Sequence, residues 1–208
     1  ESYVMFTGIV QATCEVVSVQ QQAGLKRFEI ALKPELLDRL QIGASVATNG
    51  VCLTVTKIAN DKVFFDVMEE TLSLTNLDKV QQGDQVNIER SLTFGSEIGG
   101  HILSGHIHTQ AEIVAISDTA EHYNIELVID AKWRDYIFYK GFVAVNGCSL
   151  TVGQLTEHGF KLHLIPETLR LTNLDLQAVG DKMNIEIDSQ TQVIVDTVER
   201  ILAKKQLS

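Results

Sequence analysis

The chain repeats itself at a constant spacing, and this repeat limits the folds that it can adopt. The segment ETLSLTNLD at residues 70–78 returns as ETLRLTNLD at residues 167–175, an offset of 167 − 70 = 97 residues. A duplication in one ungapped register indicates two copies of one domain. Two copies predict two similar pockets, which would suit a reaction between two similar molecules. The same offset aligns NGVCLTV with NGCSLTV (49–55 and 146–152), GDQVNIE with GDKMNIE (83–89 and 180–186) and FTGIVQATCEV with LSGHIHTQAEI (6–16 and 103–113).

Composition agrees with two small globular domains. The 208 residues divide into two units of about a hundred, a common size for a single domain. No apolar run approaches the roughly 20 residues that span a bilayer. A net charge of −10 without a basic stripe argues against a nucleic-acid partner. We therefore expect a protein that acts on a small molecule, with neither membrane nor nucleic acid as its partner.

Cysteine usage and the amino end indicate the compartment. Three cysteines without a CxxC spacing fit free thiols in a reducing environment better than a disulfide framework or a zinc site. We see no signal peptide, so we expect a cytoplasmic protein. Residues 1–4 precede a Met-Phe start, and we interpret them as an extension and leave them out of the functional argument.

The pattern within each copy is typical of strands. Short segments with period-two alternation, such as residues 46–55 and 62–68, are separated by turn residues. One stretch per copy has helical spacing, at 34–40 and at 131–139. About six short strands per copy favour a closed antiparallel barrel, because closure removes exposed edges. We predict an all-β fold of two tandem six-stranded barrels of Greek-key type, at 5–100 and 101–188, joined through the glycine-rich residues 93–100.

A helix without a counterpart in the first copy is predicted within the last segment, 189–208. Over residues 191–204, one side carries apolar residues and the other carries charged ones. The apolar stripe must be covered either by the helix's own barrel or by the same helix of other chains, and the sequence leaves both open. The apolar side comprises Ile194, Val195, Val198, Ile201 and Leu202, and the charged side Asp196, Glu199 and Arg200.

Positions that differ between the copies indicate how two half-sites could divide the chemistry. Thr54 and Thr151 are conserved between the copies, whereas neighbouring positions gain groups that transfer protons in the second copy. The first barrel would therefore hold one substrate molecule, and the second would supply most of the proton handling for another. The differing pairs are Cys52 and Ser149, Ile9 and His106, Gly43 and Lys140, and Ser91 and Asp188.

Each of these signals also has a structural explanation. Asn-Gly is a common hairpin turn, Cys52 can be a small buried hydrophobe, and threonines are good strand residues. The histidines at 101, 106 and 108 lack carboxylates or thiolates at ligand spacing other than Glu97, so we expect no metal site. The glycines at 95, 99 and 100 match no phosphate loop and are interpreted as linker.

Several motifs together resemble one known family. They are MFTGIVQ, NGVCLTV, NGCSLTV, the two ETLxLTNLD segments, EIGGHILSGH, YKGF, LIPETL and NIEID, and the match as a whole runs from residue 5 to about residue 204. The chain resembles the alpha-type riboflavin synthases. The resemblance implies a homotrimer in which each chain forms two similar six-stranded barrels and a carboxy-terminal helix that joins the trimer. It also implies an active site between the first barrel of one chain and the second barrel of its neighbour, with lumazine synthase as a candidate partner.

The resemblance further implies a transferase reaction, the last step of riboflavin synthesis. Two molecules of 6,7-dimethyl-8-ribityllumazine exchange a four-carbon unit and give riboflavin and 5-amino-6-(D-ribitylamino)uracil, without a metal or redox cofactor. The alternative is a non-catalytic lumazine-binding antenna protein, whose second repeat departs from the enzyme pattern. A flavin reductase would need a second, nucleotide-binding domain, and the chain has no GxGxxG motif.

Site residues follow from the resemblance position by position. The first-barrel site would comprise Gly8, Ile9, Val10, Cys52, Leu53, Thr54, Asp66, Val67, Met68, Glu69, Glu70 and Thr71. The second would comprise Gly105, His106, Ile107, Lys140, Ser149, Leu150, Thr151, Ile165, Pro166, Glu167, Thr168, Leu169 and Arg170. Positions associated with activity are Phe6, Cys52, His106, Ser149 and Asp188.

The reaction requires removal of a proton from the 7-methyl group of one lumazine and addition of a nucleophile to carbon 7 of the other. We expect His106 and Ser149 to relay protons, Asp188 to orient or activate the second site, and Cys52 or a water to lie near the acceptor. Replacing either threonine, Thr54 or its counterpart at 151, should mainly weaken binding. Replacing Ser149 or Asp188 should mainly lower turnover, and equal turnover losses at all four positions would contradict this division.

Overall fold

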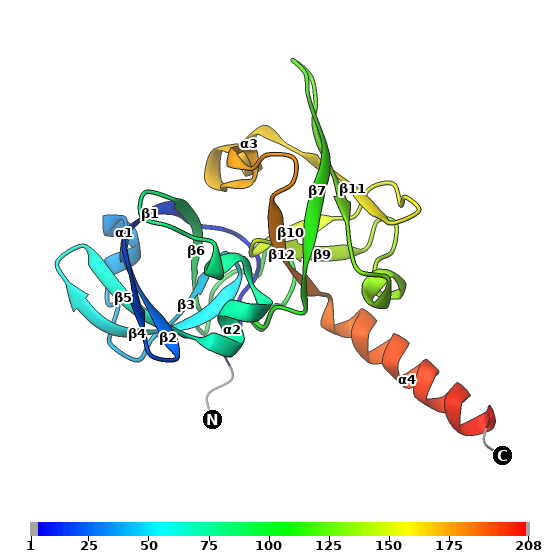
Figure 1. The fold of residues 1–208 in the computed structure, drawn as a ribbon, viewed down its shortest axis with the longest axis horizontal. Coiled ribbons are helices and arrows are strands. Elements are labelled where there is room, and N and C mark those ends of the chain that lie inside the picture. Colours follow the sequence, from blue (N-terminus) through cyan, green and yellow to red (C-terminus); the bar gives the residue numbers. More distant parts are fainter. Residues whose placement is uncertain (1–3, 207–208) are drawn as a thin grey trace.

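The computed structural model describes residues 4–206, which form two β-barrels side by side and a helix that projects from the second (Figure 1). The predicted all-β fold of two barrels and a terminal helix is confirmed. The first barrel contains β1 (Ala12–Gln22), β2 (Leu25–Ala31), α1 (Pro34–Leu37), β3 (Ser45–Thr48), β4 (Val51–Ala59), β5 (Lys62–Met68), α2 (Glu69–Leu74), the 3₁₀ helix η1 (Asn76–Asp78) and β6 (Gln85–Arg90). The second contains β7 (Thr109–Asp118), β8 (Tyr123–Val128), the 3₁₀ helix η2 (Ala131–Tyr136), β9 (Phe142–Val145), β10 (Cys148–Thr151), β11 (Gly159–Leu164), α3 (Pro166–Leu171), the 3₁₀ helix η3 (Leu174–Leu176) and β12 (Lys182–Ile187), followed by α4 (Ser189–Gln206).

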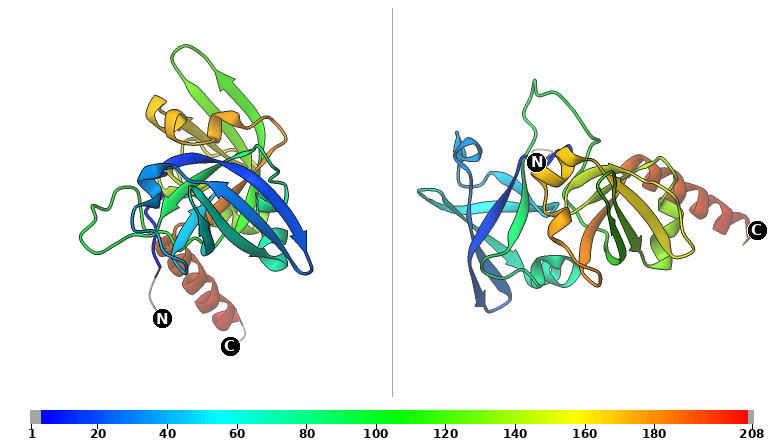
Figure 2. Two further views of the ribbon diagram at one scale, coloured as in Figure 1. Left: turned by 90° about the vertical axis from the view of Figure 1, so that its left-hand side faces the viewer. Right: turned by 90° about the horizontal axis from the view of Figure 1, so that it is seen from above.

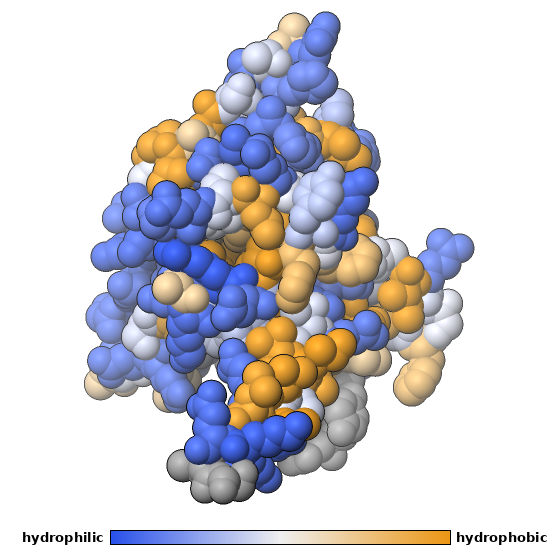
Figure 3. Space-filling view, turned by 90° about the vertical axis from the view of Figure 1, so that its right-hand side faces the viewer, coloured by the Kyte–Doolittle hydropathy of each residue, from blue (hydrophilic) through white to orange (hydrophobic). Residues whose placement is uncertain are grey.

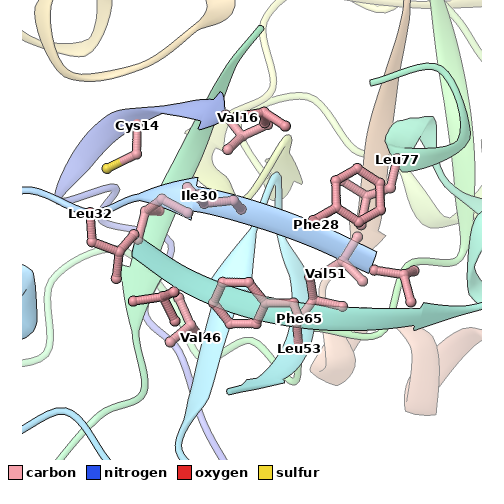
Figure 4. Close-up of a cluster of buried hydrophobic side chains, with 14 of the residues drawn as sticks. Cys14, Val16, Phe28, Ile30, Leu32, Val46, Val51, Leu53, Phe65 and Leu77 are labelled. Atoms are coloured by element: carbon pink, nitrogen blue, oxygen red, sulfur yellow. The ribbon is translucent and has the colours of Figure 1, made fainter. Parts of the chain in front are cut away.

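The first barrel closes completely, in the strand order β1-β2-β5-β4-β3-β6. Along β5 the predicted alternation holds, since Val63, Phe65 and Val67 are buried while the residues between them are more exposed. Side chains from all sides of the barrel meet in its interior, among them Phe28 and Ile30 (Figure 4). Burying each such side chain contributes about 1.5–3 kcal/mol, so this interior is the main source of the barrel's stability.

The second barrel is nearly closed, in the order β10-β9-β12-β7-β8-β11, whereas we predicted full closure. Backbone hydrogen bonds from Gly153 N to Lys161 O and from Lys161 N to Gln154 O, both 2.8 Å, bridge the remaining gap. Gly153 stands where the first copy has Thr56, since 153 − 97 = 56. A side chain there would put its Cβ 2.7 Å from the Lys161 carbonyl oxygen. Glycine therefore allows β11 to approach but shortens β10, because glycine is a poor strand residue.

Our prediction of one helix per copy is wrong. The predicted helices are present but short, as α1 and η2, and each ETLxLTNLD segment adds a helix and a 3₁₀ turn, α2 with η1 and α3 with η3. Six residues are too few to display a helical period in the sequence. Local hydrogen bonds define the helix end instead: the Thr75 hydroxyl donates to Thr71 O at 2.8 Å and accepts from Leu77 N at 3.4 Å. The predicted site segment 66–71 thus crosses from strand β5 into helix α2.

The two barrels meet across asparagines that the repeat supplies in pairs. The Asn87 amide donates to Asn146 O, and its counterpart at 184 donates to Asn49 O, both at 2.9 Å. The equality of these contacts indicates an approximate two-fold axis between the copies. Gly50 and Gly147 meet close to this axis, where a Cβ on either would lie 2.6 Å from the backbone nitrogen of the other. The Asn-Gly pairs therefore form turns, as predicted, and also bring the barrels into contact.

The segment between the barrels, residues 93–100, is exposed along most of its length and loops out in both views of Figure 2. The predicted join lies here, between the end of β6 and the start of β7. Its position in the sequence matters for the site, because the chain leaves the loop at Gly100 and continues directly between the two barrels.

Among residues 4–206, side-chain hydrogen bonds between helix α4 and its own barrel lie near the start of the helix. His108 Nε2 lies 3.0 Å from Gln192 Oε1, and the Tyr136 hydroxyl bonds to Asp196. The predicted stripe stays largely uncovered within the chain, with Ile194, Val198 and Ile201 between 48% and 65% exposed. Figure 3 shows the face toward which the helix projects, where apolar surface gathers among hydrophilic residues. Between residues 4 and 206 the structure has no helix that is long and apolar enough to cross a membrane.

Candidate active site

Two short segments, residues 6–8 and 103–105, cross from one barrel to the other. Phe6 and Leu103 pair with each other through two backbone hydrogen bonds of 2.9 Å. Beyond this bridge, Gly8 O accepts from Ser149 N at 2.7 Å, and Gly105 O accepts from Cys52 N at 2.9 Å. Each crossing segment therefore borders the binding motif of the other copy.

This crossing corrects the predicted grouping of Gly8, Ile9 and Val10 with Cys52, and of Gly105 to Ile107 with Ser149. The cores show the same exchange, since Val10 packs into the second barrel and Ile107 into the first. The physical reason is that two copies of one motif offer each segment two equivalent partners. The path of the chain decides between them, and the sequence pattern does not reveal that path.

A buried glutamate holds each crossing segment. The Glu89 carboxylate accepts from Thr7 N and Thr7 Oγ1, both at 2.7 Å, and from Gly8 N at 3.0 Å. Glu186 makes the matching three contacts with Ser104 and Gly105 at 2.7, 2.8 and 3.1 Å. Burial raises the pKa of both carboxyls, although these hydrogen bonds act in the opposite direction. Neither glutamate was predicted as a site residue, although both copies carry a glutamate at the end of an apolar strand.

Gly8 lies so close to the second barrel that only glycine fits. Its φ is +77°, and a Cβ would lie 2.5 Å from Ser149 Cβ. Gly105 meets Cys52 in the same way, at 2.6 Å and with φ +80°. Gly8 and Gly105 are therefore glycines because the backbone at these positions lies too close to the binding motif of the other copy to leave room for a side chain.

Ser149 has a histidine partner, which is His101. The Ser149 hydroxyl lies 2.6 Å from His101 Nδ1. The histidine is only 8% exposed, its ring stacks on Phe142 at 5.0 Å between centroids, and its backbone N donates to Thr7 O at 3.0 Å. Burial lowers the pKa of His101, and the charge of Asp188 partly offsets this. The ring is thus held as a neutral imidazole against the hydroxyl.

His101 was not predicted as a site residue, since in the sequence it stands out only as part of a histidine cluster. A comparison of the copies could have found it, because the offset places His101 opposite Val4, since 101 − 97 = 4. Val4 falls in the amino-terminal residues that we left out of the functional argument.

His106 and Cys52 lie at the other crossing. His106 is exposed and follows Gly105, whose carbonyl bonds to Cys52 N. Burial raises the pKa of the Cys52 thiol, with a hydrogen bond to Ser45 acting in the opposite direction. A thiol with a raised pKa is a poor nucleophile at neutral pH. Between residues 4 and 206, no hydrogen bond of this chain joins His106 to Ser149. That each of them serves in proton relay stays a prediction.

The remaining predicted residues have defined structural positions. Phe6 is buried with Leu103 in a small apolar cluster at the crossing. Asp188 precedes α4 and accepts from Thr191 N at 3.2 Å and from Thr191 Oγ1 at 3.1 Å, which is a helix N-cap arrangement. Lys140 is exposed and adopts a left-handed φ of +61°, as Gly43 does in the first copy at +90°.

The ion pairs of the two sites differ. In the first copy, Arg27 pairs with Asp66 at 2.7 and 2.9 Å and lowers the pKa of that carboxyl. In the second, Arg170 pairs instead with Glu167 on the same helix, with Nε 3.0 Å from Oε2. Arg27 was not predicted, and it orders the residue with which the first site segment begins.

Both half-sites are open on the single chain. Ile9, Thr54 and Met68 are exposed, as are Thr151 and Ile165. A cleft of about 800 Å³ does exist, but it lies between the barrels next to the asparagine contacts and is lined by none of the predicted site residues. We favour the open half-sites over this cleft, because they carry the groups that differ between the copies. In the described part of the chain, no three His, Cys, Asp or Glu side chains are placed to hold a metal ion.

Two barrels related by an approximate two-fold axis, each with one open half-site completed by a crossing segment, define a tandem-repeat protein with two related small-molecule sites. The lumazine binding domain family matches this chain twice, at residues 7–91 and 104–188. Riboflavin synthase of Escherichia coli strain K12 is 49% identical over 203 residues, which cover 97% of this chain and 95% of that protein. The chain belongs to the riboflavin synthase family.

Further relatives carry the same name. Riboflavin synthase of Chlamydia pneumoniae is 42% identical, covering 96% of this chain and 98% of that protein. Riboflavin synthase of Photobacterium phosphoreum is 35% identical, covering 95% and 89%. Among solved structures, LumP complexed with riboflavin aligns with a TM-score of 0.83 at 24% identity, over 88% of this chain and 98% of that one. LumP complexed with 6,7-dimethyl-8-(1'-D-ribityl) lumazine aligns at 0.79 and 22%. These two likenesses concern the fold.

Proposed function

We propose that this protein catalyses the dismutation of two molecules of 6,7-dimethyl-8-ribityllumazine to riboflavin and 5-amino-6-(D-ribitylamino)uracil, the transferase reaction of riboflavin synthases. The observation that carries the proposal is the pair of similar half-sites in one chain whose full length matches that family. Donor and acceptor are the same compound, so two related sites suit them both. Fixing two reactants in reacting geometry can lower a barrier by about 7 to 11 kcal/mol.

We further propose that the working site forms between the first barrel of one chain and the second barrel of its neighbour in a homotrimer. Two observations support this: the half-sites are open on the single chain, and the apolar stripe of α4 is uncovered. Lumazine synthase stays a candidate partner of this assembly on the family resemblance alone. The division into functional units at residues 5–100, 101–188 and 189–208 is part of the same proposal.

Within each half-site, backbone groups and the hydroxyls of Thr54 and Thr151 would recognise the substrate. Ser149 would handle the proton of the methyl group, and Asp188 would act on the second site through its charge. Cys52 and His106, which share the other crossing, would lie beside the second lumazine. The proposed sites thus contain the predicted residues, but each residue is assigned to the site near which it lies, whichever copy of the repeat it comes from.

A non-catalytic lumazine-binding protein is the competing function. The LumP structures share the fold, but at 22–24% identity, whereas the relatives named riboflavin synthase reach 35–49%. The second copy here also keeps Ser149, His106 and Asp188. Both features favour the enzyme.

Incubation with the lumazine as the sole added compound tests the proposal. We expect riboflavin absorbance to increase with time, and one riboflavin to form for every two lumazines consumed. Binding with a change in lumazine fluorescence but without riboflavin would instead establish a binding protein.

A further inference from the structure

We propose that His101 is a positioning residue of the second half-site, which holds the hydroxyl of Ser149 in place and takes up the proton that this hydroxyl passes on. The inference rests on the proposed dismutation, and it assigns to His101 the proton-relay role that the sequence analysis gave to His106.

The surroundings of Ser149 hold its hydroxyl against the imidazole of His101. Its hydroxyl lies 2.6 Å from His101 Nδ1, and its backbone N is bound to Gly8 O at 2.7 Å. A Cβ on Gly100 would lie 3.0 Å from Ser149 Cβ and 2.2 Å from Thr7 O. The crossing segment and the residues before His101 therefore enclose the serine from two sides. A hydroxyl held in this way has little freedom to turn from the imidazole.

His101 leaves one of its two ring nitrogens unused within the described residues. His101 Nε2 is buried and has no hydrogen-bond partner among the described residues. Buried polar atoms without a partner are rare and call for an explanation. His108 provides the comparison, since it is also half enclosed by the second barrel but uses both nitrogens: Nδ1 accepts from Ile187 N at 3.0 Å and Nε2 contacts Gln192. If His101 served packing alone, we would expect both of its ring nitrogens to have hydrogen-bond partners, as those of His108 do.

The serine and the histidine together offer a path for the proton of the lumazine methyl group. In the proposed step, a C–H bond of the lumazine methyl group breaks, and its electron pair stays on the lumazine as an anion. The proton moves to Ser149 Oγ while the hydroxyl's own proton moves to His101 Nδ1, so an imidazolium forms. Burial lowers the pKa of His101 and so disfavours the imidazolium, while the charge of Asp188 acts in the opposite direction and offsets part of this effect. The reverse transfers return the proton later in the cycle, so no outside acid or base is consumed.

The first copy lacks this pair of a serine and a histidine. The offset of 97 residues places Cys52 opposite Ser149 and Val4 opposite His101. Val4 and Cys52 pack together against the apolar cluster at the crossing. The serine–imidazole pair of the second half-site is thus replaced by an apolar side chain and a thiol in the first. Two positions change together, which gives the two otherwise similar sites different proton chemistry.

Two substitutions separate the possible roles of His101. His101→Asn keeps a polar group near the position of Nδ1 but cannot become a cation, and His101→Phe keeps a ring against Phe142 without any hydrogen bond. We expect both variants to lower kcat by about 100-fold or more, the lower range of acid–base contributions, while the Kd for the lumazine changes less than about threefold. Ser149→Ala combined with His101→Phe should be no slower than the slower single variant, because the two residues act as a unit.

His163→Asn is the matched control, since this histidine also contacts a side chain, Asn124, in the second barrel but lies outside the proposed site. It should keep the kcat of the unchanged protein. An unchanged kcat in His101→Phe would show that the histidine serves packing only and would overturn the proposal. A normal kcat in His101→Asn with a slow His101→Phe would overturn the proton-uptake part. If the unchanged protein itself forms no riboflavin, the proposed function fails, and Ser149 and His101 no longer have a proton to move.

Discussion

At the residue scale, the informative positions are those where the copies differ and those where both copies bury a charge. Comparison of the copies identified Cys52 and Ser149, and the structure places each of them against a crossing segment. The same comparison could not select Glu89, because Glu186 is identical to it. A position that differs between the copies indicates a difference in chemistry, whereas a position that is identical in both can serve either the fold or binding. The contacts of Glu89 with Thr7 and Gly8 show that its part is to hold the crossing.

Titration of Glu89 yields a prediction on stability. Burial raises its pKa in the folded protein above the ordinary value of 4.5. Between that value and the raised one, the folded state binds more protons than the unfolded state, so the free energy of unfolding falls as the pH rises. Glu89→Gln should be less stable at neutral pH by about 1–3 kcal/mol, because Gly8 N loses an acceptor, but its stability should vary less with pH.

Urea unfolding across that pH range, on both proteins, measures the difference in slope. Glu121→Gln is the control, since the Glu121 side chain is 86% exposed and should leave the slope unchanged. A slope in Glu89→Gln as steep as in the unchanged protein would show that Glu89 does not titrate in this range.

At the element scale, the strands were easier to predict than the helices. Period-two alternation over residues 62–68 is a signal that survives in the sequence, because one face of a strand is buried in a barrel. The helices α2 and α3 left no such signal, since each has six residues and depends on local hydrogen bonds of a threonine at its end. The incomplete closure of the second barrel likewise depends on one residue, Gly153, and on the space between it and Lys161.

The asparagine contacts between the barrels yield a second prediction. Asn87 Oδ1 accepts from Asn173 N at 2.7 Å, and its amide donates to Asn146 O at 2.9 Å, all within the buried interface. Asn87→Ala would leave both backbone groups unpaired, which costs about 2 to 4 kcal/mol in unfolding free energy. Asn184→Ala, its counterpart, should cost a similar amount.

Equilibrium unfolding of the two variants checks this expectation. Asn124→Ala serves as control, because Asn124 lies on β8, away from the interface, and is only partly buried. A loss below about 1 kcal/mol in Asn87→Ala would mean that water replaces the amide, and that the asparagines contribute little to the stability of the interface.

At the scale of the whole molecule, the informative feature is the apolar stripe of α4, which is largely exposed on the single chain. From the sequence, the apolar stripe could be covered by the chain's own barrel or by other chains. Within the described residues, the chain's own barrel contacts the helix near its start, and most of the stripe is exposed. Exposed apolar surface of this kind is typical of an interaction site. Together with the open half-sites, it supports the proposed trimer and a reaction that takes place between chains.

A charge within the stripe tests the assembly. Val198→Asp should shift the protein from trimer to monomer, because an isolated carboxylate is costly to bury, and turnover should fall with the trimer. Size-exclusion chromatography with light scattering gives the mass, and the riboflavin assay gives the turnover. Arg200→Gln, on the charged side of the helix, should change neither. A trimer mass in Val198→Asp, or a monomer mass in the unchanged protein, would contradict the proposed role of α4.

The sequence by itself determined the duplication, the all-β class, the terminal helix and most of the side chains now proposed for the half-sites, because these depend on residue type and on spacing along the chain. Only the tertiary structure decided which copy completes which site. Each crossing segment has two chemically similar partners, and the choice between Cys52 and Ser149 depends on the path of the chain through the Phe6–Leu103 bridge. The pairing of His101 with Ser149 likewise depends on the tertiary structure, since the two residues lie 48 positions apart and meet only in the folded chain.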